Sequence, residues 1–329
     1  MTVVSKKYGV ILINLGTPEE ATPMGVRRFL RQFLSDPRVV DLPRWLWLPI
    51  LNGIILPFRS KRVARAYASI WTPKGSPLLS ISQELCAQLA QRMADSGSCC
   101  YVELAMTYGS PSLMDVWEKL KAKNVSHVLL LPMFPQYSVS TTAPVWDAWA
   151  EIMATQTVIP SLQFSASYHN NPHYIKALAE SIRSHWQAHG PHHLLFSFHG
   201  IPVRYAEKGD PYPAQCEQTA SLVAAELGLD DDAWSLSYQS RFGKAPWIQP
   251  YTDETLSRLA LMGVKRVDII CPGFAVDCLE TLEEIAVDGN ALFMANGGEK
   301  LHYISALNAT EPHIDLFEAL IKFNIGTEI

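Results

Sequence analysis

The sequence lacks the features that mark several large classes of protein. Its six cysteines form no Cys-x-x-Cys pair, which argues against a disulfide framework and favours a reducing compartment. No apolar run approaches the roughly 20 residues of a membrane span. The N-terminal run Val10–Ile13 is too short for a signal peptide. The formal charge is −5, so the basic excess typical of a general nucleic-acid binder is missing.

Motifs for several common chemistries are absent as well. The chain has no Gly-x-Gly-x-x-Gly, no P-loop and no Gly-x-Ser-x-Gly elbow, so nucleotide binding and serine hydrolysis lack their usual apparatus. What the chain does have is length and apolar content. Its 329 residues are 48% hydrophobic and 18% charged, which is enough for two domains with packed cores or for one large domain.

Short apolar runs alternate with segments of helical period along the chain. Strands and helices that alternate in this way predict βαβ units and parallel sheets. The expected strands are Gly9–Asn14, Tyr101–Met106, His127–Pro132, Gln163–Ser167, Leu194–His199, Trp234–Tyr238 and Arg266–Pro272. The expected helices include Ser82–Asp95, Leu113–Lys123, Pro172–His189, Ala214–Leu227, Asp253–Met262 and Cys278–Val287.

The two halves of the chain follow one plan. Each has a strand that ends in glycine, a strand that ends near tyrosine, a helix, and a strand that ends in proline before an aromatic residue. The marker residues are Gly16, Tyr108, Pro132 and Phe134 in the first half and Gly200, Tyr238, Pro272 and Phe274 in the second. The plan predicts an α/β fold of two similar doubly wound parallel-sheet lobes, with a cleft between them at the carboxyl ends of strands. We expect the first lobe at residues 1–158, the second at 159–306, and a C-terminal helix within 307–329 that packs back on the first lobe.

One uncharged segment is unusual. Trp45–Phe58 is apolar, twice interrupted by proline, and flanked by Arg44 on one side and by Arg59, Lys61 and Arg62 on the other. It is either a core helix or an exposed apolar lip that touches a membrane or an apolar substrate. The tryptophans beside arginines favour the lip slightly.

His199 is the first candidate functional residue. It ends an apolar strand and is followed by Gly200-Ile201-Pro202, which would place an imidazole at the floor of the cleft. A single histidine after a strand is more often structural, but the Gly and Pro that stop the strand here raise the odds of a functional role.

A series of acidic residues is the stronger signal. Asp277, Glu280, Glu284 and Asp288 follow a strand and a Pro-Gly break at spacings of 3, 4 and 4, which would place them on one face of a helix. Acidic stripes are usually solvated surfaces, but this one starts at the end of a strand inside the expected cleft. Clustered carboxylates there could hold a divalent cation or relay protons.

Two other groups are interpreted as structural. His185 and His189 lie four residues apart on a helix, but without a His-Glu-x-x-His motif they are taken as a solvated helix face. The neighbouring Cys99 and Cys100 have no partner cysteines nearby in the sequence.

Aromatic and hydroxyl groups complete the expected cleft. The segment Pro135–Thr142 offers hydroxyl donors before a helix, where anions are favoured. Tyr238, Trp247 and Phe274 could enclose a flat apolar ring system.

On these residues the chain strongly resembles the ferrochelatase family, the terminal enzymes of heme synthesis. The matching motifs occur in the family's order and cover nearly the whole chain. They are Ile13–Pro18, Pro135–Thr142, Ser197–Pro202, Gly209–Pro213, Tyr238–Gly243, Pro246–Trp247 and Phe274–Glu284.

The resemblance implies a chelatase-like fold that inserts Fe²⁺ into protoporphyrin IX, giving protoheme with loss of two pyrrole protons. It implies that His199 is the metal-side ligand or the proton acceptor, and that Glu280 faces it across the macrocycle as the second catalytic and metal-binding residue. Asp277, Glu284 and Asp288 would form the acid path. The expected porphyrin-binding residues are Leu15, Tyr108, Tyr137, Ser138, Trp247 and Phe274.

The resemblance also bears on cofactors, partners and location. We expect Fe²⁺ as a substrate, no permanently bound cofactor, and no [2Fe–2S] cluster, because the chain ends at Ile329 without the cysteine-bearing extension of the animal enzymes. We expect a cytoplasmic protein that touches the inner face of the membrane through Trp45–Phe58, and an iron donor protein as a further partner.

Two residues depart from the family pattern. Thr107 stands where many relatives have a basic residue, which bears on contacts to the porphyrin propionates, and Cys278 stands where some have a histidine. The alternatives are a diverged chelatase that acts on coproporphyrin, another tetrapyrrole or another metal, and a non-catalytic two-lobed protein that binds porphyrin, a metal or a solute.

Overall fold

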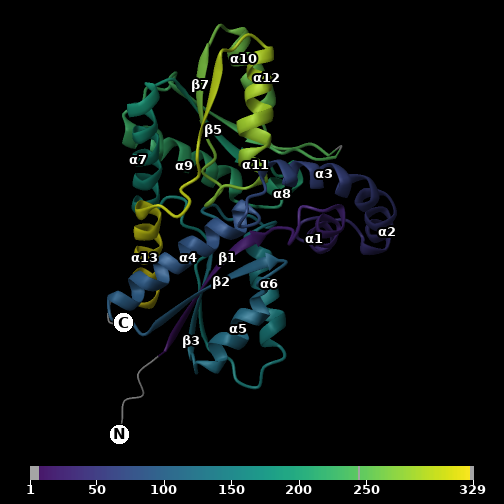
Figure 1. Ribbon diagram of the computed structural model, residues 1–329, viewed down its shortest axis with the longest axis vertical. Helices are drawn as coiled ribbons and strands as arrows, with labels where there is room; N and C mark the ends of the chain where they lie inside the picture. The colour runs from purple at the N-terminus through teal and green to yellow at the C-terminus, as the bar shows by residue number, and fades with distance from the viewer. Residues whose placement is uncertain (1–6, 244, 327–329) are drawn as a thin grey trace. The chain divides into compact units, whose positions relative to one another are not determined.

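A computed structural model describes residues 7–243 and 245–326. These residues form two compact units. The first contains residues 7–134, 139–167 and 309–326, and the second contains residues 135–138, 168–243 and 245–308. Each unit is an α/β sandwich built on its own parallel sheet (Figure 1).

The first unit is built around strand β1 (Tyr8–Gly16). Val10–Ile13 in this strand are fully buried, as expected for a strand covered by helices on both faces. The strand order is β2-β1-β3-β4, with every neighbouring pair parallel, and the other strands are β2 (Cys100–Tyr108), β3 (His127–Pro132) and β4 (Ser161–Phe164). Its helical segments are α1 (Pro23–Ser35), α2 (Arg44–Ile50), the π-helix η1 (Leu51–Ile55), α3 (Leu56–Ile70), α4 (Pro77–Asp95), α5 (Leu113–Ala122), α6 (Thr142–Met153) and α13 (Glu311–Ile325).

The second unit repeats this topology. Its strand order is β6-β5-β7-β8, again parallel throughout, with β5 (His193–His199), β6 (Trp234–Gln239), β7 (Arg266–Ile270) and β8 (Lys300–Ile304). Figure 1 shows α7 and α9 on one side of this sheet and α10 and α12 on the other. The helical segments are α7 (Pro172–His189), α8 (Val203–Glu207), α9 (Tyr212–Leu227), α10 (Thr252–Leu261), α11 (Leu279–Leu282), the π-helix η2 (Glu284–Gly289) and α12 (Asn290–Ala295).

The matching strand orders confirm the prediction of two similar parallel-sheet lobes. Each unit also has an apolar core of its own. In the first, Trp117 of α5 and Trp149 of α6 pack edge to face at 5.4 Å over Ile11 and Ile13. In the second, Phe293 of α12 is fully buried in a cluster with β5 and β7 residues.

Three details differ from the expectations. The first unit continues to Ser167 rather than ending at residue 158, because β4 pairs with β3. Strand β8 was not expected, since its sequence Lys-Leu-His-Tyr-Ile mixes polar and apolar residues. The helix expected at Cys278–Val287 is instead the short α11 followed by η2, so the acidic residues there do not share one regular α-helical face.

The C-terminal helix α13 belongs to the first unit. It packs against α4 and β3. Arg92 of α4 pairs with Glu311 and Asp315 of this helix.

Candidate functional site

The carboxyl edge of the second sheet gathers several of the predicted residues. His199 is the last residue of β5, Gln239 is the last residue of β6, and Phe274 follows shortly after β7. Because the carboxyl ends of parallel strands lie at one edge of a sheet, these residues are neighbours despite their separation in sequence. They belong to a single unit, so their arrangement is set by one sheet.

The imidazole of His199 is held in one tautomer. Its Nδ1 lies 2.7 Å from the carbonyl oxygen of Gly200, which can only accept a hydrogen bond, so Nδ1 carries the proton in the neutral ring. The lone pair is therefore on Nε2, the outer nitrogen of a half-buried ring. Nε2 is free to bind a cation or to accept a proton.

Gly200 gives room to an aromatic neighbour. A Cβ at this position would lie 3.2 Å from Cε3 of Trp247 and 3.1 Å from the carbonyl oxygen of Gln239. The Trp247 ring centroid is 6.3 Å from that of His199, and its Nε1 donates to the carbonyl of Phe242. The glycine after His199 thus lets an indole approach the imidazole.

Gln239 connects the strand of His199 to the acidic segment. Its Oε1 accepts hydrogen bonds from Ser197 Oγ at 2.7 Å and from Cys271 Sγ at 3.4 Å. Its Nε2 donates to the backbone carbonyl of Glu280 at 2.8 Å. One buried side chain therefore fixes the backbone of Glu280 relative to β5. The sequence analysis did not single out this residue, although it lies in one of the matched motifs.

Asp277 is tied into the fold by many donors. Its carboxylate accepts from Tyr303 at 2.5 Å, Asn308 Nδ2 at 2.8 Å, the Ala306 backbone at 3.1 Å and Thr281 at 3.3 Å. The side chain is 6% exposed. Such a carboxylate has little capacity for a further ligand, and its contacts hold the start of α11.

Glu284 has a perturbed acidity. Its pKa is raised from 4.5 to about 7, chiefly by burial and less by the charge of Glu280, while a hydrogen bond from Ser240 acts in the opposite direction. Ser240 Oγ donates to Glu284 Oε2 at 2.5 Å, from a backbone with φ of +65°. Glu284 can therefore gain and lose a proton near neutral pH.

The acidic residues become more exposed along the chain. Asp277 is buried, Glu280 and Glu284 are half-buried, and Asp288 is exposed. Cys278 is buried between them and caps the N-terminus of α11 through Thr281, and burial raises the pKa of its thiol. The series therefore runs from the interior of the second unit to solvent, while Cys278 serves the helix start.

The predicted residues Tyr137 and Ser138 also belong to the second unit. The Tyr137 backbone N–H donates to Gln215 at 2.7 Å, and Ser138 Oγ donates to Asp210 at 2.9 Å. Asp210 also accepts from the Tyr212 backbone at 3.0 Å. The start of α9 thereby anchors this short segment.

In the first unit, three singled-out residues lie at the carboxyl ends of β1 and β2. The half-buried Leu15 donates its backbone N–H to Asn14 Oδ1 at 2.8 Å, and Thr107 Oγ1 donates to the Asn14 carbonyl at 3.2 Å. Tyr108 is 4% exposed, and its hydroxyl donates to Asp36 at 2.8 Å. Burial and the Asp36 charge raise the pKa of Tyr108, so this phenol stays protonated.

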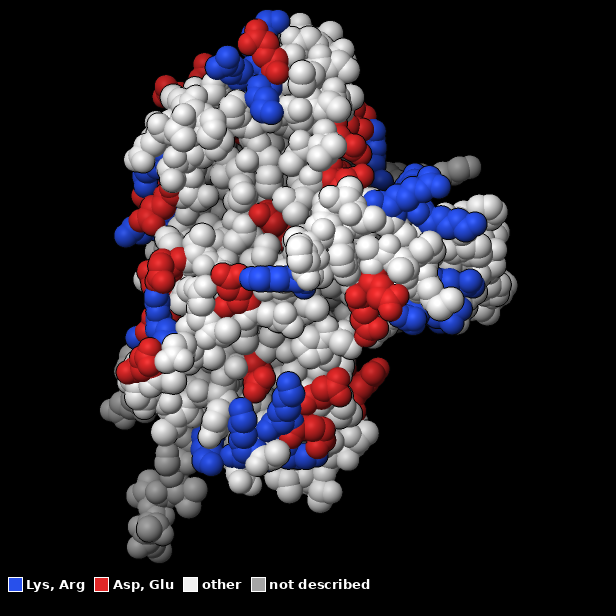
Figure 2. All heavy atoms as spheres, viewed as in Figure 1, with Lys and Arg blue, Asp and Glu red and all other residues white. Residues whose placement is uncertain are grey.

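The segment Trp45–Phe58 forms an exposed apolar lip rather than a core helix. Trp45 is 79% exposed, Phe58 77% and Ile54 56%. Trp47 differs from them: it is 6% exposed, and its Nε1 donates to the Leu34 carbonyl at 2.6 Å. Figure 2 shows white surface at the right of the view, where α2 lies in Figure 1, with Lys and Arg gathered beside it.

A helix that crosses a bilayer needs about 20 consecutive, mostly apolar residues. Over the described ranges 7–243 and 245–326, no helix combines the length and apolar character needed to cross a bilayer.

Comparison with known proteins identifies the family. The model of the family described as Ferrochelatase matches residues 7–325. The chain is 54% identical to a ferrochelatase of Aeromonas hydrophila over 97% of this chain and 98% of that protein. It is 52% identical to ferrochelatase 1 of Shewanella oneidensis over 98% and 97% of the two chains.

Solved structures agree on the fold. The sirohydrochlorin chelatase SirB from Bacillus subtilis, solved with cobalt, aligns with a TM-score of 0.57 at 9% identity and covers 98% of this chain and 97% of its own. CbiX, described as the terminal enzyme of siroheme biosynthesis in denitrifying bacteria, aligns with a TM-score of 0.51 at 12% identity, over 96% and 98%. These likenesses establish the chelatase fold alone. The family model and the sequence identities show that the chain belongs to the ferrochelatase family.

Proposed function

We propose that the chain inserts Fe²⁺ into protoporphyrin IX to give protoheme, using His199 and Glu280. The family gives the reaction class of metal insertion in heme biosynthesis. The observation that carries the site assignment is the carboxyl edge of the second sheet, where Gln239 joins the strand of His199 to the backbone of Glu280.

The reaction needs a base and a bent macrocycle. The nitrogen lone pairs of a flat porphyrin lie in the ring plane, so a metal enters more easily when binding energy bends the ring. Two pyrrole N–H bonds break as Fe²⁺ binds the four ring nitrogens, so two protons leave and the charge of the ion is balanced by the porphyrin dianion. His199 Nε2 has the lone pair to accept the first proton or to hold the entering Fe²⁺.

The acidic residues supply the route for protons. Gln239 ties the backbone of Glu280 to the strand of His199, and Glu284, whose pKa is about 7, exchanges protons readily at neutral pH. Asp288 is exposed and ends the route at solvent, while the hydrogen-bonded Asp277 anchors its inner end. A gradient from buried to exposed carboxylates suits protons that leave the protein.

Residues of both units would contact the porphyrin. We assign Trp247, Phe274, Tyr137 and Ser138 of the second unit to the macrocycle and its substituents, and Leu15 and Tyr108 of the first unit to the same ligand. Thr107 lies beside Tyr108, and its hydroxyl is occupied by a backbone carbonyl. We therefore expect residues other than Thr107 to contact the propionates. The same residues would set the choice between protoporphyrin and coproporphyrin.

We further propose that the lip docks on the cytoplasmic face of a membrane. Its exposed aromatic residues Trp45 and Phe58 would enter the headgroup region, with Lys61 and Arg62 beside anionic lipid. An apolar substrate could then pass from the bilayer to the protein. An iron donor protein would deliver Fe²⁺ at the exposed end of the acid series, near Asp288.

No resident cofactor is part of the proposal. Burial raises the pKa of the Cys86 and Cys100 thiols to about 12, and raises the pKa of Cys216, Cys271 and Cys278 well above its usual value. Among the described residues, the one group of three His, Cys, Asp or Glu side chains close enough to share an ion consists of histidines, so the described cysteines do not gather at one place as the ligands of an iron–sulfur cluster do. Protein purified without oxygen should therefore lack the visible absorption of such a cluster.

The first test is anaerobic turnover with protoporphyrin IX and Fe²⁺, followed by the change from free-base to metalloporphyrin absorption. His199→Ala and Glu280→Ala should each lower kcat at least about 100-fold. The exposed His173→Ala and Glu207→Ala serve as controls and should keep the activity of the unmodified chain. Folded His199→Ala and Glu280→Ala proteins with normal turnover would overturn the site assignment, and porphyrin binding without any turnover by the unmodified chain would make it a carrier.

A further inference from the structure

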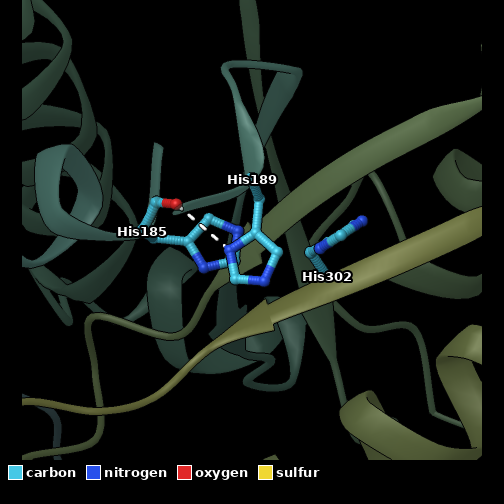
Figure 3. A group of neighbouring side chains, drawn as sticks. All are labelled: His185, His189 and His302. Atoms are coloured by element: carbon cyan, nitrogen blue, oxygen red, sulfur yellow. Dashed lines mark hydrogen bonds between the residues drawn. The ribbon is translucent and has the colours of Figure 1, made fainter. Parts of the chain in front are cut away.

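A second group of potential metal ligands lies away from the residues assigned to the reaction. His185 and His189 lie one turn apart on α7, and His302 lies on the neighbouring edge strand β8 (Figure 3). Each ring offers one nitrogen, and the three nitrogens lie within 4.8 Å of one another. In a bound site with metal–nitrogen distances of about 2.0–2.1 Å, ligand nitrogens are separated by up to about 4 Å, so small side-chain rotations would complete the geometry.

The rings are packed together rather than spread into solvent. The rings of His185 and His189 are stacked at 4.4 Å, and the ring of His302 meets them edge-on at 5.6 and 5.1 Å. Closely packed imidazoles repel one another when protonated, and the neutral form is the one that binds a metal.

A buried carboxylate, that of Asp268, lies within hydrogen-bonding distance of His185. Asp268 of β7 is fully buried, and its Oδ1 lies 3.3 Å from His185 Nε2 and 3.2 Å from His192 Nδ1. Trp186 Nε1 donates to its Oδ2 at 2.8 Å. A carboxylate that holds one ring nitrogen leaves the other nitrogen as a donor to a metal, the arrangement usually found behind metal-bound histidines.

His189 is the most exposed member of the set. It is exposed, and its Nδ1 makes a 3.2 Å hydrogen bond to the backbone carbonyl of His185. That bond leaves Nε2 with the lone pair. Rotation of this one side chain would unstack the pair and turn Nε2 toward a shared ion.

We propose that His185, His189 and His302 bind a borderline divalent transition-metal ion such as Zn²⁺ at a site separate from the one that metallates porphyrin. Three neutral imidazoles suit zinc, nickel or copper better than hard cations, which prefer oxygen ligands. The bound ion would join α7 to the edge strand β8.

The three histidines lie toward the amino end of β5, whereas His199 lies at its carboxyl end. His302 pairs with Asp268, which pairs with Leu194 near the start of β5, whereas His199 ends β5 five residues later, about 17 Å away at roughly 3.3 Å per residue. A metal held by the three histidines is therefore not in contact with the residues assigned to iron insertion.

The test is a titration of the full chain with Co²⁺ or Zn²⁺ in the absence of porphyrin. Co²⁺ is followed by its visible ligand-field bands and Zn²⁺ by competition with a chromophoric chelator. The titration is repeated in the double variant His199→Ala/Glu280→Ala, which removes the other candidate ligands. We expect this variant to keep one equivalent of bound metal, and His189→Ala in the same background to weaken that binding at least tenfold.

His173→Ala is the matched control, because this exposed histidine lies in the first turn of the same helix. It should bind metal as the parent does. Zn²⁺ at about 100 times its Kd should raise the Tm of the parent by about 5 °C or more and leave that of His189→Ala unchanged.

His302→Ala should lose the same equivalent, and if it fails to fold, the exposed His189→Ala decides alone. Metal binding that is unchanged in His189→Ala, or no bound equivalent in the double variant, would refute the three-histidine site. Neither result depends on turnover, so the proposal stands or falls independently of the assigned reaction.

Discussion

At the scale of single residues, the candidate site depends on hydrogen bonds that fix direction. The Gly200 carbonyl sets the tautomer of His199, and Gln239 holds the backbone of Glu280, the two residues proposed to be catalytic. Neither effect is visible in the type of residue alone. Substitution of a positioning residue should therefore also lower turnover, although that residue does not touch the substrate.

Gln239→Ala should lower turnover more than it lowers porphyrin binding. Without the amide, the backbone of Glu280 loses its link to β5, and a misplacement of about 1 Å can cost roughly 100-fold in rate. We expect kcat to fall about 10- to 100-fold, with KM changed less than threefold, in steady-state assays. The exposed Gln83→Ala provides the control. A Gln239→Ala protein with unchanged kcat would show that Glu280 needs no such support.

Glu284→Gln should change how stability depends on pH. The pKa of Glu284 is raised from 4.5 to about 7, so the native state holds this proton more tightly than the unfolded chain. Its stabilising effect is complete below pH 4.5 and is lost as the pH rises through 7. The amide variant keeps a neutral group at every pH, so it should exceed the parent by about 1–3 kcal/mol in free energy of unfolding at pH 8 and match it near pH 4.5.

Urea denaturation of the two proteins at both pH values checks this expectation. The exposed Glu207→Gln should give curves parallel to the parent across the whole range. Equal stability of Glu284→Gln and the parent at pH 8 would mean that the carboxylate is not buried as described.

At the scale of elements, the lip shows how one short segment divides its side chains between two tasks. Trp47 is buried and hydrogen-bonded to the end of α1, whereas Trp45, Ile54 and Phe58 are exposed. The buried indole holds the segment in place, and the exposed side chains are available for a membrane. Replacement of the two tryptophans should therefore have different consequences.

The double substitution Trp45→Ser/Phe58→Ser should reduce binding to anionic liposomes at least about tenfold and leave Tm unchanged. Each lost aromatic side chain removes roughly 1.5–3 kcal/mol of apolar burial in the bilayer interface. Phe323→Ser is the matched control, since this α13 residue in the same unit is 86% exposed. Trp47→Ser should instead lower stability by about 3 kcal/mol or more. Liposome sedimentation and thermal melts separate the two effects, and unchanged partitioning of the double variant would remove the lip from membrane binding.

The sequence predicted some elements better than others for physical reasons. Strands such as β1 and β3 are continuous apolar runs buried on both faces, which sequence patterns detect well. Strand β8 lies at an edge and carries Lys300 and His302, so it gives no such signal. The acidic spacing predicted a regular helix, but the π-helix η2 changes the period, and local spacing cannot reveal that break.

At the scale of the whole molecule, a repeated topology carries unlike chemistry in its two copies. The marker glycine after the first strand has different tasks: Gly16, with φ of +113°, allows close approach of β2, and Gly200 makes room for Trp247. Within residues 7–243 and 245–326, the second copy places a histidine, His199, and an acid series after its strand ends. The fold was therefore predictable from the repeat, whereas the Gln239 network and the three-histidine group needed the tertiary structure. Gln239 bonds to residues 32 to 42 positions away, and His302 lies 113 and 117 positions from His189 and His185.

Two ligands should therefore protect different parts of the chain in hydrogen exchange. The residues assigned to porphyrin belong to both units, so protoporphyrin IX should slow exchange near the carboxyl ends of β1 and β2 as well as β5 and β6. Zn²⁺ should slow exchange only in α7 and β8, where the three histidines lie. Mass spectrometry of peptides from the full chain, with each ligand added separately, measures both patterns. The His189→Ala variant should lose the zinc pattern and keep the porphyrin pattern, and protection by porphyrin in one unit alone would contradict the assignment of Leu15 and Tyr108 to the macrocycle.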